Sequence, residues 1–308
     1  MAFGLPFKMA GILTAGGDVH LERTGVALVT LFPCGFLLSL PQMETPAIQT
    51  HGLTRRFGAL TAVENVTLSV SSGQFFGFLG PNGAGKSTTI KMLTGLLEPS
   101  AGSVEILGEP FTAGSLELKR QIGVVPEGMA LMGRLTATEY LHFVGRMYGL
   151  DRPTTLRRTE ELLEFMQLAN ENKKLVTDFS HGMQKKLALA AAVIHGPKVL
   201  FLDEPFEGVD AIAAGMLKNM LTGMINRGAT IFLTTHVLEI VERLCSHVAI
   251  ISKGMLVANG SLDQLRAGVA STLPGAEQEQ RLTLEEIFLA IVGAGGRQEQ
   301  AQELTWLT

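Results

Sequence analysis

A glycine-rich turn after a short apolar run constrains the fold of this chain more than any other feature. The apolar run covers residues 74–79, and a segment with helical character follows over residues 86–97. The turn between them fits the pattern G-x-x-x-x-G-K-[ST] and consists of Gly80, Pro81, Asn82, Gly83, Ala84, Gly85, Lys86, Ser87 and Thr88. This order of strand, loop and helix predicts a phosphate-binding loop in an α/β protein.

The residues of this loop have the chemistry that a bound phosphate requires. Glycines let several backbone N–H groups point at phosphate oxygens, and the following helix adds its positive N-terminal end. Lys86 supplies a positive charge for the β- and γ-phosphates of a nucleotide, and Ser87 offers a hydroxyl to Mg²⁺. The alternative is a glycine-rich turn without a ligand, which the strand before it and the helix after it disfavour.

Two carboxylates end a second apolar run, residues 199–202. Asp203 and Glu204 follow this run directly, and the carboxyl ends of parallel strands face the ligand crevice of an α/β sheet. Asp203 would then hold Mg²⁺, and Glu204 would accept a hydrogen bond or a proton from an attacking water molecule. On its own the pair would be a solvated strand end. Beside a phosphate loop, a nucleotide site is the better interpretation.

Short β-like runs alternate with helical stretches from Pro46 onward, which is typical of an α/β protein. The apolar runs 74–79, 198–202 and 229–233 suit strands buried on both faces. Residues 136–192 have mostly helical character, and a last amphipathic helix is expected over 284–292. Six apolar residues are expected to share one helix face: Leu156, Leu162, Leu163, Phe165, Met166 and Leu168.

The composition excludes a disordered chain and disfavours some partners. Of the 308 residues, 46% are hydrophobic and 18% are charged, which leaves ample material for a core. The net charge of −4 argues against nucleic acid as the main partner, because such proteins normally carry a basic excess. Cys34 and Cys245 are too few for a disulfide framework, so a reducing compartment is expected.

Residues 1–42 contain the one segment with membrane-like character, at 25–40. With Pro33 in its middle it is short for a spanning helix, which needs about 20 residues. A signal peptide is a rival interpretation, but no good cleavage site follows. Two further interpretations are that the protein begins at Met43 and that residues 1–42 form a peripheral or disordered extension. We expect an N-terminal extension over 1–42.

Five further elements resemble motifs of the ATP-binding cassette (ABC) family and occur in the family's order. The resemblance covers about residues 46–260 and continues weakly to about residue 292. The elements are Phe57 within 54–58, the Pro-Glu pair within 124–127, the segment 180–184, the segment 205–210 and the segment 234–236.

The resemblance implies a role for each element. Phe57 resembles the aromatic residue that stacks on adenine, and His236 resembles the histidine that senses the γ-phosphate. Ser180 and Gly182 resemble the family signature, which binds the γ-phosphate in the opposite subunit, so that a complete site needs two cassettes. Asp210 belongs to a D-loop-like segment that would cross to the partner's phosphate loop. Taken alone, Phe57 could be a core residue and His236 a capping histidine.

The sequence departs from the family pattern at two places. Glu127 stands where most members have Gln; its carboxylate could orient water or contact Mg²⁺, but it adds negative charge near Asp203 and Glu204. Mutual repulsion could therefore raise the pKa of one carboxyl or alter metal affinity. His181 and Met183 replace Gly and Gln in the signature, and a side chain at 181 crowds the phosphate contact.

These variants, with the segment 283–289, are similar to the exporter branch in which cassette and permease are separate chains. The resemblance implies a P-loop NTPase fold with a mainly parallel core sheet, an antiparallel β region and an inserted helical subdomain. We place the ATPase domain at 43–260, the helical subdomain at about 128–185, and a helical appendix and tail at 261–308.

The leading hypothesis is an ATP-hydrolysing subunit that uses ATP and Mg²⁺, with Lys86, Glu204 and His236 as catalytic residues. It would dimerise head-to-tail around ATP with an identical or different cassette. It would power a separate multi-span permease, an exporter, from the cytoplasmic face of the cell membrane. Two alternatives stay open: an ABC-type ATPase that acts on ribosomes or nucleic acid, and a regulatory cassette that binds ATP without hydrolysing it.

Overall fold

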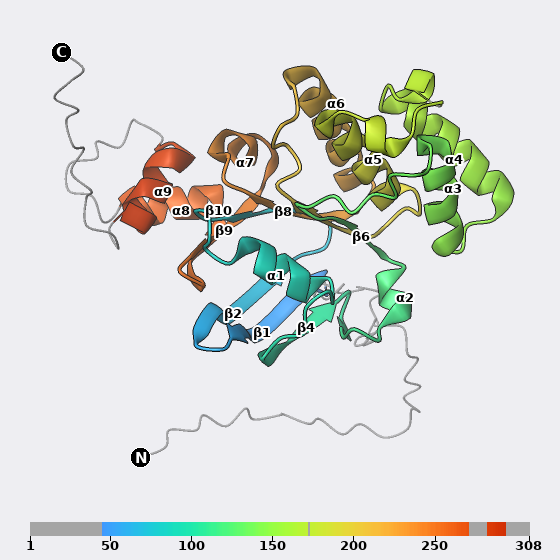
Figure 1. Cartoon of the computed structure of the whole chain (residues 1–308). Helices are drawn as coiled ribbons and strands as arrows, with labels where there is room; N and C mark the ends of the chain where they lie inside the picture. Colours follow the sequence, from blue (N-terminus) through green and yellow to red (C-terminus); the bar gives the residue numbers. More distant parts are fainter. Residues whose placement is uncertain (1–44, 172, 271–281, 294–308) are drawn as a thin grey trace, which may run out of the picture. The chain divides into compact units, whose positions relative to one another are not determined.

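A computed structural model of the chain describes residues 45–171, 173–270 and 282–293 (Figure 1). The chain divides into the units 1–44 and 45–308, and the described helices and strands belong to the second unit. The predicted extension 1–42 and most of the predicted tail lie outside the described residues. Within the described ranges, no helix has the length and apolar character that crossing a membrane requires.

Two β-sheets form the framework of the fold. The first is antiparallel in the order β2-β1-β4-β5, with β1 Ile48–Phe57, β2 Leu60–Val70, β4 Ala101–Ile106 and β5 Glu109–Pro110. The second has the order β10-β9-β3-β8-β7-β6, with β3 Phe75–Leu79, β6 Ile122–Val125, β7 Val199–Asp203, β8 Thr230–Thr235, β9 His247–Ser252 and β10 Met255–Ser261. In this second sheet, every described pairing is parallel except that of β9 with β10.

Helices cover both faces of the six-stranded sheet. In Figure 1, α1 lies between the two sheets, while α3 to α7 lie on the other side of the six-stranded sheet. The described α-helices are α1 Lys86–Leu93, α2 Leu116–Lys119, α3 Ala137–Met147, α4 Arg152–Phe165, α5 His181–Val193, α6 Ala211–Ile225, α7 Leu238–Leu244, α8 Leu262–Ala270 and α9 Leu284–Gly293. The 3₁₀ turns Ala169–Glu171 and Val176–Asp178 separate α4 from α5. The predicted parallel core sheet, antiparallel region and helical insertion are confirmed.

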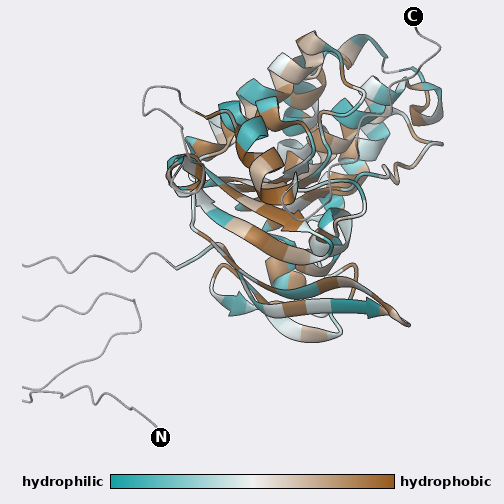
Figure 2. Ribbon diagram, turned by 90° about the vertical axis from the view of Figure 1, so that its left-hand side faces the viewer, coloured by the Kyte–Doolittle hydropathy of each residue, from teal (hydrophilic) through white to brown (hydrophobic). Residues whose placement is uncertain are grey.

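The six-stranded sheet separates two apolar cores because successive side chains of a strand point to opposite faces. On β3, Phe76 and Phe78 pack toward the antiparallel sheet and α1, and the ring of Phe76 stacks on that of Phe232 with centroids 5.5 Å apart. Phe75 and Leu79 point to the other face, which packs against the helices. Figure 2 shows hydrophobic residues on the strands between these layers. Burial on both faces explains the continuous apolar runs in the sequence.

The predicted apolar face over residues 156–168 is only partly correct. Leu163, Met166 and Leu168 are buried as predicted, but Leu156 and Phe165 are exposed. The buried stripe of α4 reaches Leu163 through Thr155 and Thr159, which lie eight and four residues before it. Thr155 can be buried because its hydroxyl donates to the backbone oxygen of Asp151 at 2.7 Å. Inward-facing threonines therefore shift the buried face away from the one that the apolar residues predict.

Candidate active site

The predicted phosphate loop connects β3 to α1 at the carboxyl edge of the parallel strands. Gly83 and Gly85 have φ of +77° and +108°, a region that favours glycine. A Cβ added to Gly80 would lie 2.4 Å from the backbone oxygen of Ile251, and one added to Gly85 would lie 2.7 Å from that of Ala62. Glycine is thus required for the backbone to follow this path against the neighbouring strands.

The first turn of α1 is suited to an anion. Its N-cap is Gly85, which supplies no side-chain cap, and the first turn contains no acidic residue. The N–H groups of this turn are therefore left for a ligand. Lys86 is buried beside them, and its Nζ donates to the backbone oxygen of Gly80 at 2.8 Å and lies 3.5 Å from Oε1 of Glu204. The ammonium group is held over the loop, where phosphate oxygens would bind.

Asp203 ends β7 as a buried carboxylate. Thr234 on the adjacent strand donates a hydrogen bond from its hydroxyl to Oδ1 of Asp203. Burial raises the pKa of Asp203, and the neighbouring carboxylates of Glu127 and Glu204 raise it further. Hydrogen bonds from Thr234 and Ser87 act in the opposite direction on the same pKa. The repulsion that we predicted from Glu127 is thus present, although burial is the larger cause.

Glu204 has a main-chain conformation that is unusual for its residue type. Its φ is +48°, and its N–H donates to the backbone oxygen of Thr234 at 3.1 Å. The carboxylate is buried, and its Oε1 lies 3.1 Å from Nδ1 of His236. On the main-chain side, Nζ of Lys185 donates to the backbone oxygen of Glu204 at 2.7 Å. Contacts on several sides therefore hold this residue in place.

Oxygen donors for a divalent cation meet beside the phosphate loop. The hydroxyl of Ser87 donates to Oε2 of Glu127 at 3.2 Å, and its hydrogen bond to Asp203 lowers the pKa of that carboxyl. Among the described residues, no three His, Cys, Asp or Glu side chains form a metal site on their own. Mg²⁺ prefers one or two carboxylates together with substrate phosphates, so the donors present fit this ion.

A pocket of about 360 Å³ brings many of the predicted residues together. Its lining consists of Ala62, Asn82, Gly83, Gly85, Lys86, Ser87, Thr88, Glu127, Glu204, Glu207 and His236. The loop, the Glu204 carboxylate and His236, which are far apart in sequence, thus face one space. The sequence analysis gave no role to Ala62 or to Glu207, although Glu207 lies in the D-loop-like segment 205–210.

The remaining predicted residues do not line this pocket. Ser180 is the N-cap of α5 and accepts a hydrogen bond from the N–H of Met183 at 3.3 Å, so the helix begins slightly before the predicted start near Met183. Gly182 is open, because an added Cβ would have its nearest neighbour 4.0 Å away. Asp210 caps α6 and accepts from the N–H of Ala213 at 2.8 Å. Their predicted roles require a second cassette and stay predictions.

Phe57 ends β1, and its side chain is 45% exposed. The guanidinium carbon of Arg55 lies 4.6 Å from the centre of its ring. Phe57 is therefore not a core residue, which removes the alternative interpretation. Stacking on adenine stays a prediction, because Phe57 does not line the pocket.

Lys185 is the functional candidate that the sequence analysis missed. It lies on α5, it is only 5% exposed, and it contacts Glu204 from behind the pocket. Burial lowers the pKa of Lys185, while four nearby carboxylates, with Glu207 the strongest, act in the opposite direction. Two adjacent lysines follow the signature-like segment in sequence, and nothing in the pattern indicates which of them is buried.

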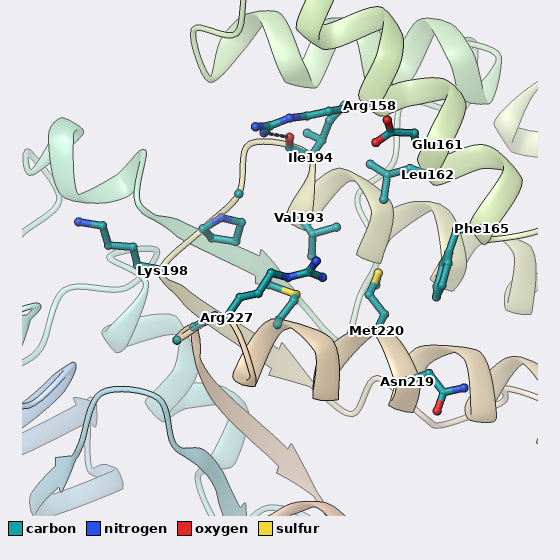
Figure 3. A pocket seen from close by; sticks show the side chains of 15 residues that line it. Arg158, Glu161, Leu162, Phe165, Val193, Ile194, Lys198, Asn219, Met220 and Arg227 are labelled. Atoms are coloured by element: carbon teal, nitrogen blue, oxygen red, sulfur yellow. Dashed lines mark hydrogen bonds between the residues drawn. The ribbon is translucent and has the colours of Figure 1, made fainter.

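A larger pocket of about 720 Å³ lies at the opposite edge of the parallel strands (Figure 3). Residues that directly precede β7 and β8, namely Lys198 and Ala229, help to line it, together with side chains from α4 and α6. Arg158 points across it and donates to the backbone oxygen of Ile194 at 2.6 Å. None of the predicted catalytic residues lines this pocket, so we do not assign the reaction to it.

The sequence is similar to known transport proteins. A family model described as "ABC transporter" matches residues 63–207. Nod factor export ATP-binding protein I of Ralstonia nicotianae is 38% identical over 222 residues, which are 72% of this chain and 69% of that protein. The chain belongs to the ABC transporter family. The bacitracin transport ATP-binding protein BcrA of Bacillus licheniformis is also 38% identical, over 220 residues and 71% of each chain.

A solved structure of an ABC transporter ATP-binding subunit agrees with this assignment. It is 33% identical, has a TM-score of 0.72, and the match covers 80% of this chain and 99% of that one. The predicted ABC cassette and its P-loop fold are confirmed, and the chain is accordingly an ATPase whose hydrolysis is coupled to transport. The matched residues 63–207 of the ABC family model include the phosphate loop, Glu127, Ser180 and Glu204.

Proposed function

We propose that this ABC cassette is the nucleotide-binding subunit of a membrane exporter. It binds ATP with Mg²⁺, pairs head-to-tail with a second cassette and drives a separate permease at the cytoplasmic face of the membrane. The observation that carries the proposal is the pocket in which Lys86, Glu204 and His236 face the phosphate loop. The names of the relatives, which include export and transport ATP-binding proteins, support the direction of transport.

The phosphate loop holds the triphosphate of ATP. Backbone N–H groups of the loop after Pro81 and of the N-terminus of α1 donate to the phosphate oxygens, and the ammonium of Lys86 adds a positive charge. Ser87, Asp203 and Glu127 would hold Mg²⁺, which neutralises charge on the phosphates when it is bound. Lys86 now lies 3.5 Å from Oε1 of Glu204, so a bound phosphate competes with this carboxylate for the ammonium.

Glu204 acts as the base toward the attacking water. Its carboxylate accepts a hydrogen bond or a proton from water as the oxygen attacks the γ-phosphorus of ATP, and the bond to the leaving β-phosphate oxygen breaks. His236 orients the carboxylate through the 3.1 Å contact of its Nδ1 with Oε1. Because the chemistry is mostly positioning and charge stabilisation, small displacements of these groups should cost much of the rate.

A second cassette completes the site. Ser180 and Gly182 lie at the N-terminus of α5, a helix of 13 residues whose dipole favours an anion. They do not line the pocket of their own chain, and Gly182 is open. This placement supports binding of the γ-phosphate held by the partner, with Asp210 at the same junction.

The helical subdomain offers a surface for the permease. Phe143 and Met147, one turn apart on α3, and Met132 in the preceding loop are exposed, with Met147 67% exposed. Exposed apolar side chains of this size are typical of protein interfaces. We assign this surface to a segment of the permease, which selects the cargo.

The test measures the release of phosphate from ATP by the purified chain, in the presence of Mg²⁺ and of the membrane partner. We expect Glu204→Gln to bind ATP and dimerise, with turnover reduced about a hundredfold or more. Glu161→Gln, on the exposed side of α4, is the matched control and should turn over normally. Normal turnover by Glu204→Gln would overturn the base assignment. Binding of ATP without any turnover by the native chain would favour a regulatory cassette.

Co-purification tests the transport role separately. We expect the native chain in the membrane fraction together with a multi-span protein. Recovery with ribosomes or nucleic acid instead would overturn the exporter proposal.

A further inference from the structure

The ammonium group of Lys185 is buried beside the main chain of Glu204, and it has no part in the hydrolysis proposed for this site. Burying a charged group costs free energy unless polar partners compensate for the lost water. Among the described residues, its hydrogen-bond partner is a main-chain oxygen, that of Glu204, at 2.7 Å. Four nearby carboxylates favour the charged form of Lys185, but the group to which it donates a hydrogen bond is this carbonyl, which suggests that the carbonyl has to be held.

The main chain of Glu204 is strained. A φ of +48° lies in the left-handed region, which residues other than glycine, asparagine and aspartate seldom adopt. Such a conformation persists only where the surroundings impose it. Here the N–H of Glu204 donates to Thr234, and its carbonyl accepts from Lys185. These two hydrogen bonds fix the peptide groups on both sides of the Glu204 Cα.

The direction of the Glu204 side chain depends on this main-chain geometry. If the residue relaxed to negative φ, its Cα–Cβ bond would rotate away from the present direction. The carboxylate would then lose its contacts with His236 and Lys86, now at 3.1 Å and 3.5 Å. A group that holds the carbonyl therefore also holds the carboxylate in the pocket.

We propose that Lys185 is a positioning residue, which holds the main chain of Glu204 so that its carboxylate points into the pocket. This inference rests on the proposed role of Glu204 as the base. Lys185 lies five residues after Ser180, the N-cap of α5. One rigid helix thus joins the end that would meet the partner's nucleotide to the base of its own chain.

The test compares two substitutions that differ in their ability to donate a hydrogen bond. Lys185→Met keeps the apolar stem and removes the donor, and we expect kcat to fall about a hundredfold, with KM and the Kd for ATP within about twofold. Lys185→Gln keeps a donor, so kcat should stay within about tenfold of native. The control is Lys186→Met on the same helix, which should retain native turnover.

A double substitution separates positioning from general destabilisation. In the Glu204→Gln background, adding Lys185→Met should change the residual rate less than about twofold, because both changes act through one group. Native kcat in folded Lys185→Met would overturn the inference, as would a raised KM with unchanged kcat. A further large loss in the double variant would also overturn it.

Two controls keep the outcome interpretable. The Tm of each variant shows whether it is folded, and Lys185→Ala is assayed with and without added propylammonium, which fills the cavity and restores the donor. Recovery of kcat supports the inference, and absence of recovery in folded Lys185→Ala overturns it. If the native chain shows no turnover, or if Glu204→Gln turns over normally, the failure lies with the proposed function rather than with Lys185.

Discussion

Nδ1 of His236 lies 3.1 Å from Oε1 of Glu204, and the same oxygen lies 3.5 Å from Nζ of Lys86. One carboxylate oxygen is thus shared between an imidazole and an ammonium group. His236 is half exposed while Glu204 is buried, so the histidine is the member of the pair that meets an incoming ligand first.

His236→Ala should therefore impair catalysis more than binding. Without the imidazole, the Glu204 carboxylate loses one of its two cationic or polar neighbours, and we expect kcat to fall roughly tenfold to a hundredfold. The Kd for ATP should change less than about threefold, because the phosphate loop is intact. Steady-state kinetics and equilibrium ATP binding check this, with His51→Ala in the antiparallel sheet as a control. A loss confined to binding would contradict the assignment.

Glu127→Gln should shift the acid side of the pH–rate profile. The Glu127 carboxylate contributes to raising the pKa of Asp203, so its removal lowers that pKa. Asp203 then stays ionised to lower pH, and activity should persist to lower pH than in the native chain. The profile of kcat against pH measures this, and Glu161→Gln should leave it unchanged. A shift toward higher pH would disprove the interaction between the two carboxylates.

Alanine substitutions at two glycines of the phosphate loop should distinguish the effect of a steric clash from that of backbone strain. Gly83→Ala introduces strain alone, because φ is +77° and nothing lies within 4 Å of an added Cβ; its cost should be about 1–2 kcal/mol. Gly80→Ala forces a Cβ to within 2.4 Å of the backbone oxygen of Ile251, which requires the main chain to shift. We expect the larger loss of stability and ATP affinity for Gly80→Ala. Urea unfolding and ATP titration of both variants test the order.

His195 should make stability fall on mild acidification. Burial lowers its pKa from 6.5 to about 4, its Nδ1 is buried without a hydrogen-bond partner among the described residues, and its ring stacks on Tyr148 with centroids 3.7 Å apart. Between pH 6.5 and about 4, the unfolded chain binds a proton here that the folded chain does not, so the free energy of unfolding rises with pH through this window.

His195→Phe keeps a ring against Tyr148 and removes the titration. The dependence of Tm on pH between 4 and 6.5 should be shallower in this variant, although its Tm at pH 7 falls because the bond from Nε2 to the Ile122 carbonyl, 3.0 Å long, is lost. His51→Phe, at an exposed position, should leave the slope in place. An unchanged slope in His195→Phe would show that the dependence of Tm on pH between 4 and 6.5 does not come from His195.

The sequence predicts the strands that are buried on both faces, since β3, β7 and β8 are continuous apolar runs. It also predicts the start of α1 and the residues of the phosphate loop, because a local pattern determines both. These features need no knowledge of what packs against them.

Features that depend on distant partners are not predictable in this way. The burial of Thr155 and Thr159 reflects the packing of α4, and the left-handed φ of Glu204 reflects contacts from β8 and α5. Lys185 is buried and its neighbour Lys186 only partly buried, yet the two are the same residue type in the sequence. Whether Phe57 meets adenine, and whether Ser180, Gly182 and Asp210 meet a partner, depends on molecules beyond a single chain.

The two pockets open at opposite ends of β7 and β8, which are five and six residues long. Roughly 17–20 Å of extended backbone therefore separates the hydrolytic edge from the other edge. Gly228, with φ +87° and no atom within 4 Å of an added Cβ, is at that remote edge. A dye or an affinity handle inserted there would follow the cassette through its working cycle while leaving nucleotide turnover untouched.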